Sequence, residues 1–146
     1  MILDNYARLA DSQTFSSDAY GLYSYDLANV TPKRNVGAGT GLALVWNIES
    51  DATVNADTID LQIVTSANAN LTSDIDLASW RIAGASLTSG AIFVQPFPAG
   101  KNLYRRYVGC RVEVGTGDSV TASCHIVPMT DVESHEYYAD AVTYDA

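Results

Sequence analysis

Apolar and polar residues alternate with a period of two over most of the chain, which is the pattern of half-buried β-strands. The clearest example covers residues 41–49, where Leu42, Leu44, Trp46 and Ile48 share one face and polar residues occupy the other. The same alternation predicts a strand at residues 58–66, and two further runs predict strands at residues 76–83 around Trp80 and at residues 90–95. Because Trp46 belongs to the apolar face of its strand, we expect it in the core.

Two longer strands are predicted at residues 103–114 and 119–127. Gly115-Thr116-Gly117-Asp118 between them favours a β-hairpin, because both glycines can adopt positive φ. If Val114 pairs with Val120, this register places Cys110 directly opposite Cys124 on the core face. Both cysteines are then expected to be small buried apolar residues, and reducing conditions favour thiols over a disulfide.

Helical periodicity is confined to residues 2–9, about two turns at most. Elsewhere, strand patterns are separated by polar, turn-prone segments at residues 31–40, 50–57, 68–74 and 96–101. Roughly six to eight short strands with such turns predict an antiparallel sandwich or barrel in a single domain. Residues 131–146 carry five acidic side chains, three tyrosines and no Lys or Arg. We expect this acidic tail to be disordered or to lie on a neighbour.

Composition excludes several classes of function. The chain has 146 residues, enough for its own core, and 17 acidic against 8 basic residues give a net charge of −9. This charge argues against nucleic acid or an anionic membrane as the main partner, because both require clustered Lys and Arg. No apolar run approaches the roughly 20 residues that span a bilayer. The first residues lack the features of a secretory signal, so we expect synthesis in the cytoplasm and use there or in something assembled there.

Motifs for catalysis or for cofactor binding are scarce. The run Gly37–Gly41 lacks the Lys of a phosphate-binding loop and precedes a strand. A hydrolytic triad would need His125, on the outward face of a predicted strand, or His135 in the acidic tail, and neither has evident partners. We therefore expect no enzyme and no cofactor. The cysteines lack the spacing of a zinc site. Two groups of aspartates are more typical of turns than of a calcium site; they are Asp51 with Asp57 and Asp60, and Asp74 with Asp76.

The most distinctive feature is a basic and aromatic segment. Four of the eight basic residues fall within residues 101–111, in an otherwise acidic chain. Arg and Tyr are enriched where protein interfaces hold their binding energy, so the segment is a candidate contact with another protein. Internal pairing of these arginines with the surplus carboxylates is the equally weighted alternative. The candidate residues are Lys101, Tyr104, Arg105, Arg106, Tyr107 and Arg111.

Three places in the chain carry a resemblance to a known family. The first is the opening Met1-Ile2-Leu3-Asp4 with Ala10-Asp11-Ser12-Gln13. The second is the order of a Gly-rich segment (Gly37, Gly39, Gly41), the strand 42–49, and residues 59–66 ending in Thr-Ser. The third is Pro98, Gly100, Arg106 and Tyr107, followed by Thr121 and Ala122 after Gly117. Over roughly residues 1–129, the chain resembles the capsid cement (decoration) proteins of tailed phages related to the short-tailed Bordetella phage.

The resemblance implies an all-β antiparallel jelly roll, a form of β-sandwich. The expected organisation is a single domain with an N-terminal arm at residues 1–10, a jelly roll at 11–129 and the acidic tail at 130–146. The implied role is structural: the protein sits on the outside of an icosahedral shell, bridges capsomers of the major capsid protein, and assembles as a homo-oligomer, a dimer or trimer. The virion, assembled in the bacterial cytoplasm, is then its location.

Two alternatives stay open from the residues alone. One is a carbohydrate-binding, lectin-like jelly roll that stacks sugars on aromatic side chains. Trp80 is the candidate for such stacking, because Trp46 is expected in the core. The other is a small β-barrel enzyme, which would need a pocket that contains His125 with a carboxylate in hydrogen-bond reach.

Overall fold

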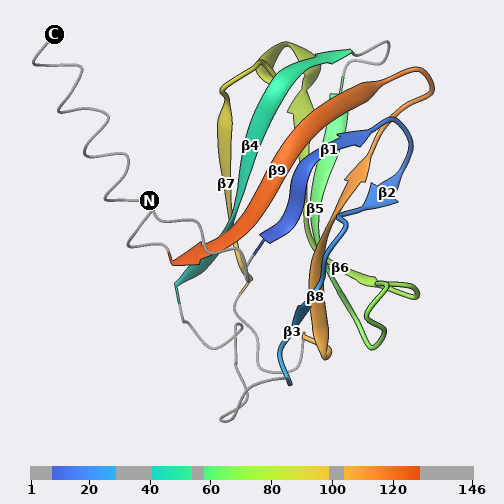
Figure 1. The fold of residues 1–146 in the computed structure, drawn as a ribbon, viewed down its shortest axis with the longest axis vertical. Helices are drawn as coiled ribbons and strands as arrows, with labels where there is room; N and C mark the ends of the chain where they lie inside the picture. Colours follow the sequence, from blue (N-terminus) through green and yellow to red (C-terminus); the bar gives the residue numbers. More distant parts are fainter. Residues whose placement is uncertain (1–7, 29–40, 54–57, 99–103, 129–146) are drawn as a thin grey trace, which may run out of the picture.

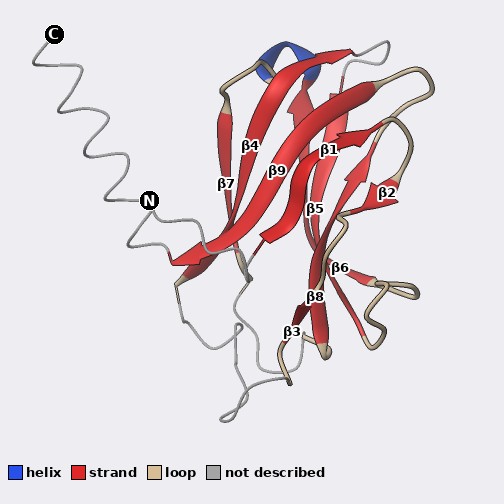
Figure 2. Ribbon diagram, viewed as in Figure 1, coloured by secondary structure: helices blue, strands red, loops and turns tan. Residues whose placement is uncertain are grey.

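Two antiparallel β-sheets packed face to face form the protein (Figures 1 and 2). The computed structural model describes residues 8–28, 41–53, 58–98 and 104–128. Within them lie β1 (Arg8–Phe15), β2 (Ala19–Tyr20), β3 (Tyr25–Asp26), β4 (Leu42–Thr53), β5 (Thr58–Ser66), β6 (Ile75–Ala83), β7 (Ile92–Pro96), β8 (Tyr107–Glu113) and β9 (Ser119–Pro128), with a short 3-10 helix at Gly84–Ser86. The expected all-β class and the antiparallel sandwich are confirmed.

The order of the strands is that of a jelly roll. Sheet A has the order β1-β9-β4-β7, and sheet B has the order β2-β8-β5-β6, with β3 also paired to β8. Most neighbours within a sheet are therefore far apart in sequence, whereas strands that follow one another mostly belong to opposite sheets. Among the longer strands, β5 and β6 form the consecutive pair that shares a sheet.

The strongly alternating segments fold as the sequence predicts. The strands expected at residues 58–66 and 119–127 are β5 and β9, and those at 41–49, 76–83, 90–95 and 103–114 correspond to β4, β6, β7 and β8 with shifted ends. Strands β1, β2 and β3 were not predicted. The register of β1 against β9 is interrupted twice, and Ser12 within it has φ of 45°, so its sequence shows no regular alternation.

One expectation at the N-terminal end needs correction. Residues 8–10 belong to β1 rather than to an arm, and Leu9 and Ala10 are buried in the core. Arg8 and Leu9, at the end of the stretch with helical periodicity, therefore lie in a strand. Residues 1–7 and the acidic tail at 130–146 lie outside the described residues.

The hairpin expected at residues 115–118 is also wrong. A turn is present, with φ of 83° at Gly117 and a hydrogen bond of 3.1 Å from the Asp118 N–H to the Gly115 carbonyl. It joins β8 in sheet B to β9 in sheet A, so the two strands do not pair. Val120 pairs with Phe15 of β1 instead of Val114. In a jelly roll this short connection crosses between the sheets.

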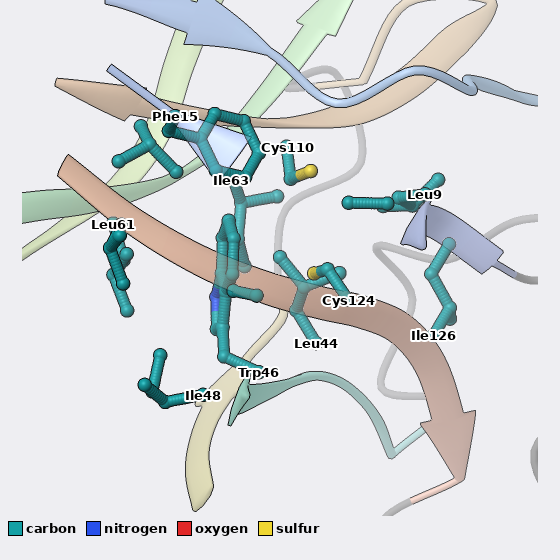
Figure 3. Packing of buried hydrophobic residues seen from close by; sticks show 14 of the residues in the cluster. Leu9, Phe15, Leu44, Trp46, Ile48, Leu61, Ile63, Cys110, Cys124 and Ile126 are labelled. Carbon is teal, nitrogen blue, oxygen red and sulfur yellow. The ribbon is translucent and has the colours of Figure 1, made fainter. Parts of the chain in front are cut away.

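The core lies between the sheets and is built around Trp46 (Figure 3). Its indole is fully buried, as expected, and donates a hydrogen bond of 3.2 Å to the Gln95 side-chain oxygen. The Gln95 amide in turn donates to the Leu61 carbonyl of sheet B at 3.2 Å. Gln95 therefore satisfies the only polar atom of Trp46 and connects the two layers, which is how a buried polar pair remains compatible with an apolar core.

No helix in the described residues is long and apolar enough to cross a membrane.

Candidate interaction surface

The basic and aromatic segment lies where the chain enters β8. Its backbone is anchored by Thr65 of β5, which is fully buried. The Arg105 N–H donates to the Thr65 hydroxyl oxygen at 2.8 Å, and that hydroxyl donates to the Tyr107 carbonyl at 2.9 Å. One hydroxyl thus holds both ends of the Arg105–Tyr107 stretch, which fixes where the two arginine side chains leave the backbone.

Arg106 is bound by its own chain. Its guanidinium donates two hydrogen bonds, of 3.0 and 2.8 Å, to the two carboxylate oxygens of Asp26 in β3. The guanidinium carbon also lies 5.0 Å from the centre of the Tyr107 ring. The hydrogen bonds from Arg106 lower the pKa of Asp26, and they raise the pKa of Arg106. For this arginine, internal pairing is what the structure shows.

Arg111 and Tyr104 are also committed to internal contacts. Arg111 forms an ion pair of 3.1 Å with Glu113 and lies 5.7 Å from the centre of the Tyr20 ring. Tyr104 donates its hydroxyl to the Pro98 carbonyl at 2.6 Å, and its ring lies 6.2 Å from that of Phe97. Burial raises the pKa of Tyr104 to about 12. Both side chains therefore already have partners within the chain.

Arg105 differs from the other arginines. Its side chain is exposed and forms no ion pair with another described residue, whereas Arg8, Arg81, Arg106 and Arg111 each have an acidic partner. Lys101, the remaining candidate cation, lies outside the described residues. Among the described cations of the segment, Arg105 is thus the one without an internal ion pair.

Exposed apolar side chains lie on two edge strands, outside the basic and aromatic segment. Ile75 (42% exposed) and Trp80 (37%) lie on β6, the last strand of sheet B. Ile92 (46%) lies on β7, the last strand of sheet A. Such edges present unpaired backbone groups beside apolar side chains, which is the usual character of a strand that meets another chain. Among these residues, Trp80 is the one that the sequence already offers as an exposed aromatic side chain.

The histidine on which a catalytic alternative depends lies between strands. His125 of β9 is 9% exposed and pairs in register with Arg8 of β1 and Val45 of β4. Burial lowers its pKa, the Arg8 charge lowers it further, and Asp11 acts in the opposite direction. Asp11 is itself hydrogen bonded to Arg8 at 2.6 Å. The imidazole forms no hydrogen bond with another described residue, so the geometry shows no acid–base pair there.

The aspartates that were considered for calcium make other contacts. Asp51 accepts a hydrogen bond from the Ser89 N–H at 2.7 Å, Asp60 pairs with Arg81, and Asp74 accepts from the Tyr20 hydroxyl at 2.7 Å. Asp57 lies outside the described residues. Within the described ranges, no three His, Cys, Asp or Glu side chains gather as a metal site.

The family model described as Bbp16 matches residues 9–126, which run from β1 into β9 and so include the whole sandwich. No curated protein matches the chain.

Proposed function

The chain belongs to the Bbp16 family, a phage-related family, and from this membership we propose that it is a cement protein of a tailed-phage capsid. The proposed role is to bind the outer surface of the icosahedral shell, bridge capsomers of the major capsid protein and stabilise the expanded shell. The observation that carries the proposal is the extent of the family match, which covers the sandwich from its first strand to its last.

The architecture suits a mechanical role. A subunit that binds only the expanded lattice stabilises that lattice by mass action. Each contact can be weak, because many copies that span neighbouring capsomers act together through their effective concentration. A domain with a continuous core from Leu9 to Ile126 supplies the rigid body that such bridging needs.

We assign the contacts of this role to two partners. Arg105, exposed and without an ion pair among the described residues, offers a charge to an acidic surface of the major capsid protein. The edge strands β6 and β7, with Ile75, Trp80 and Ile92, offer apolar surface to a second copy of the chain. Because the chain has a net charge of −9, nucleic acid and membrane are not among the proposed partners. The proposed location is the outer surface of the virion, with synthesis in the host cytoplasm.

The proposal is tested by co-sedimentation of the purified protein with expanded phage capsids that lack it. Saturable binding at a fixed ratio to the major capsid protein, together with a higher melting temperature of the particle, is the expected result. Unexpanded shells serve as the control, because the mechanism requires weaker binding to them. Absence of binding to expanded shells would overturn the cement role.

Trp80 supports a second candidate, a carbohydrate-binding module. Its side chain is 37% exposed on an edge strand, where a sugar could stack on the ring. The test is the fluorescence of wild type and of Trp80→Phe on titration with glycans. A saturable change that is lost in Trp80→Phe favours this candidate, and no change removes it.

A further inference from the structure

Two thiols meet in the core, although their strands belong to different sheets. Cys110 comes from β8 in sheet B and Cys124 from β9 in sheet A, and neither side chain is exposed. Cys110 pairs in register with Ile63, and Cys124 with Trp46 and Ala10. Figure 3 shows both side chains in the same part of the core, beside Leu9 and Leu44.

Residues 21–23 form backbone hydrogen bonds with both sheets at this point. The Gly21 N–H donates to the Cys110 carbonyl of sheet B at 2.9 Å, and the Tyr23 N–H donates to the Leu9 carbonyl of sheet A at 3.0 Å. A Cβ on Gly21 would lie 2.5 Å from both the Cys110 sulfur and the Leu9 carbonyl oxygen. The chain at Gly21 therefore packs tightly against both Cys110 of sheet B and Leu9 of sheet A, next to the place where Ala10 pairs with Cys124.

We propose that Cys110 and Cys124 form an intrachain disulfide between the two sheets when the protein meets a low-molecular-weight disulfide outside a reducing compartment. In the first exchange, the thiolate of one cysteine attacks the reagent RSSR, forms a mixed disulfide and releases RS⁻. In the second, the other cysteine displaces the second RS⁻ and closes the Cys110–Cys124 bond. The two cysteine protons end on the two released RSH molecules, so the dithiol is oxidised and the reagent is reduced.

Burial sets the rate of this reaction. The pKa of Cys124 is raised by burial and by the neighbouring Cys110 thiol, so little thiolate is present at neutral pH. Attack by a buried thiol also requires local opening of the core. The thiols consequently persist during a short stay in a reducing cytoplasm and oxidise slowly afterwards. A stabilising role of this disulfide in the virion rests on the function proposed above. The oxidation itself is a property of the isolated chain.

The test uses the purified full chain and does not involve capsids. The protein is incubated with oxidised glutathione, then unfolded and treated with iodoacetamide, and its intact mass is measured. The expected product is a monomer two hydrogens lighter that takes up no alkyl group. Its melting temperature should lie roughly 10 °C above that of the reduced chain, because the bond restricts the unfolded state. Addition of dithiothreitol should reverse both changes.

Cys110→Ala and Cys124→Ala are the controls, and each should form at most a mixed disulfide with no gain in melting temperature. If both wild-type thiols stay alkylatable under conditions that oxidise the urea-unfolded chain, the proposal is overturned. It is overturned equally if the disulfide links two chains, or if the intrachain bond lowers the melting temperature. Because no shell is present, these outcomes are independent of whether the protein binds capsids.

Discussion

Arg106 and Asp26, eighty positions apart in the sequence, form a two-point ion pair with N–O distances of 3.0 and 2.8 Å. The pair ties β3 to the start of β8, where the Leu27 N–H also donates to the Arg106 carbonyl at 2.9 Å. An arginine that the sequence offers as a contact for a partner is thus held by the chain itself. Arg106 therefore contributes to the stability of the folded chain, and this contribution depends on pH because it requires the ionised Asp26 carboxylate.

Asp26→Asn should lower the free energy of unfolding slightly at neutral pH. The folded-state pKa of Asp26 is below its ordinary value, so the pair stabilises the protein above the unfolded pKa, and this contribution is lost as the pH falls through the folded pKa. Urea unfolding across a pH series should show the wild type and the variant converging in acid. A difference that stays constant with pH would show that the carboxylate charge is not the cause.

Gln95→Leu should destabilise the protein by about 1–3 kcal/mol, because it leaves buried hydrogen-bonding groups unpaired. The groups affected are the Trp46 indole N–H and the Leu61 carbonyl. Urea unfolding gives the free energy of unfolding. Trp46→Phe, which removes the indole donor, is the companion variant. In a protein that already carries Trp46→Phe, Gln95→Leu should lower the free energy of unfolding by less than it does in the wild type. An equal loss in both proteins would mean that the hydrogen bond contributes nothing.

Gly21→Ala should destabilise the protein by about 1–3 kcal/mol through overpacking. The new Cβ would lie 2.5 Å from the Leu9 carbonyl oxygen, a backbone atom that cannot move without shifting β1. Leu22→Ala is the matched control on the next residue, whose side chain is 65% exposed, and it should change stability very little. Thermal unfolding of both variants makes the comparison, and similar melting temperatures would contradict the close approach of Gly21 to the Leu9 carbonyl.

His125→Gln should make stability less dependent on pH in the mildly acidic range. Burial lowers the folded-state pKa of His125, so below about pH 6.5 the unfolded chain takes up a proton before the folded chain does. The wild type therefore loses stability as the pH falls from there through the folded pKa, and the variant lacks this loss. Melting temperatures across that range provide the measurement, and parallel curves for the two proteins would refute the assignment.

Arg105→Gln should weaken attachment to expanded capsids by roughly tenfold if Arg105 forms the proposed charged contact. Arg8→Gln is the matched control, since it removes the same charge from an arginine of β1, a strand assigned to neither partner, whose partner Asp11 lies on the same strand. Co-sedimentation at increasing salt gives both affinities. Equal binding by the two variants would dismiss Arg105 as the contact while leaving the cement role in place.

Local pattern predicted the strands well where one face is buried throughout. In β4 and β9 the apolar residues Leu44, Trp46, Cys124 and Ile126 are all in the core, as their alternation indicates. The pattern failed at β1, because bulges and the positive φ of Ser12 break the alternation. It also failed to place the candidate contact, since a run of basic residues looks the same whether its carboxylate partners are on another protein or on a distant strand.

What the sequence determined by itself is the class of the fold, the inward faces of β4, β5, β8 and β9, and the burial of Trp46, Cys110 and Cys124. These follow from side-chain alternation and hydrophobicity, which are local properties. Only the tertiary structure decided that β8 and β9 lie in opposite sheets, that Arg106 meets Asp26, and that Cys110 and Cys124 reach the same part of the core from different sheets. Each of these depends on which distant strands pair, and a turn such as Gly115–Asp118 is compatible with a hairpin and with a crossing between sheets alike.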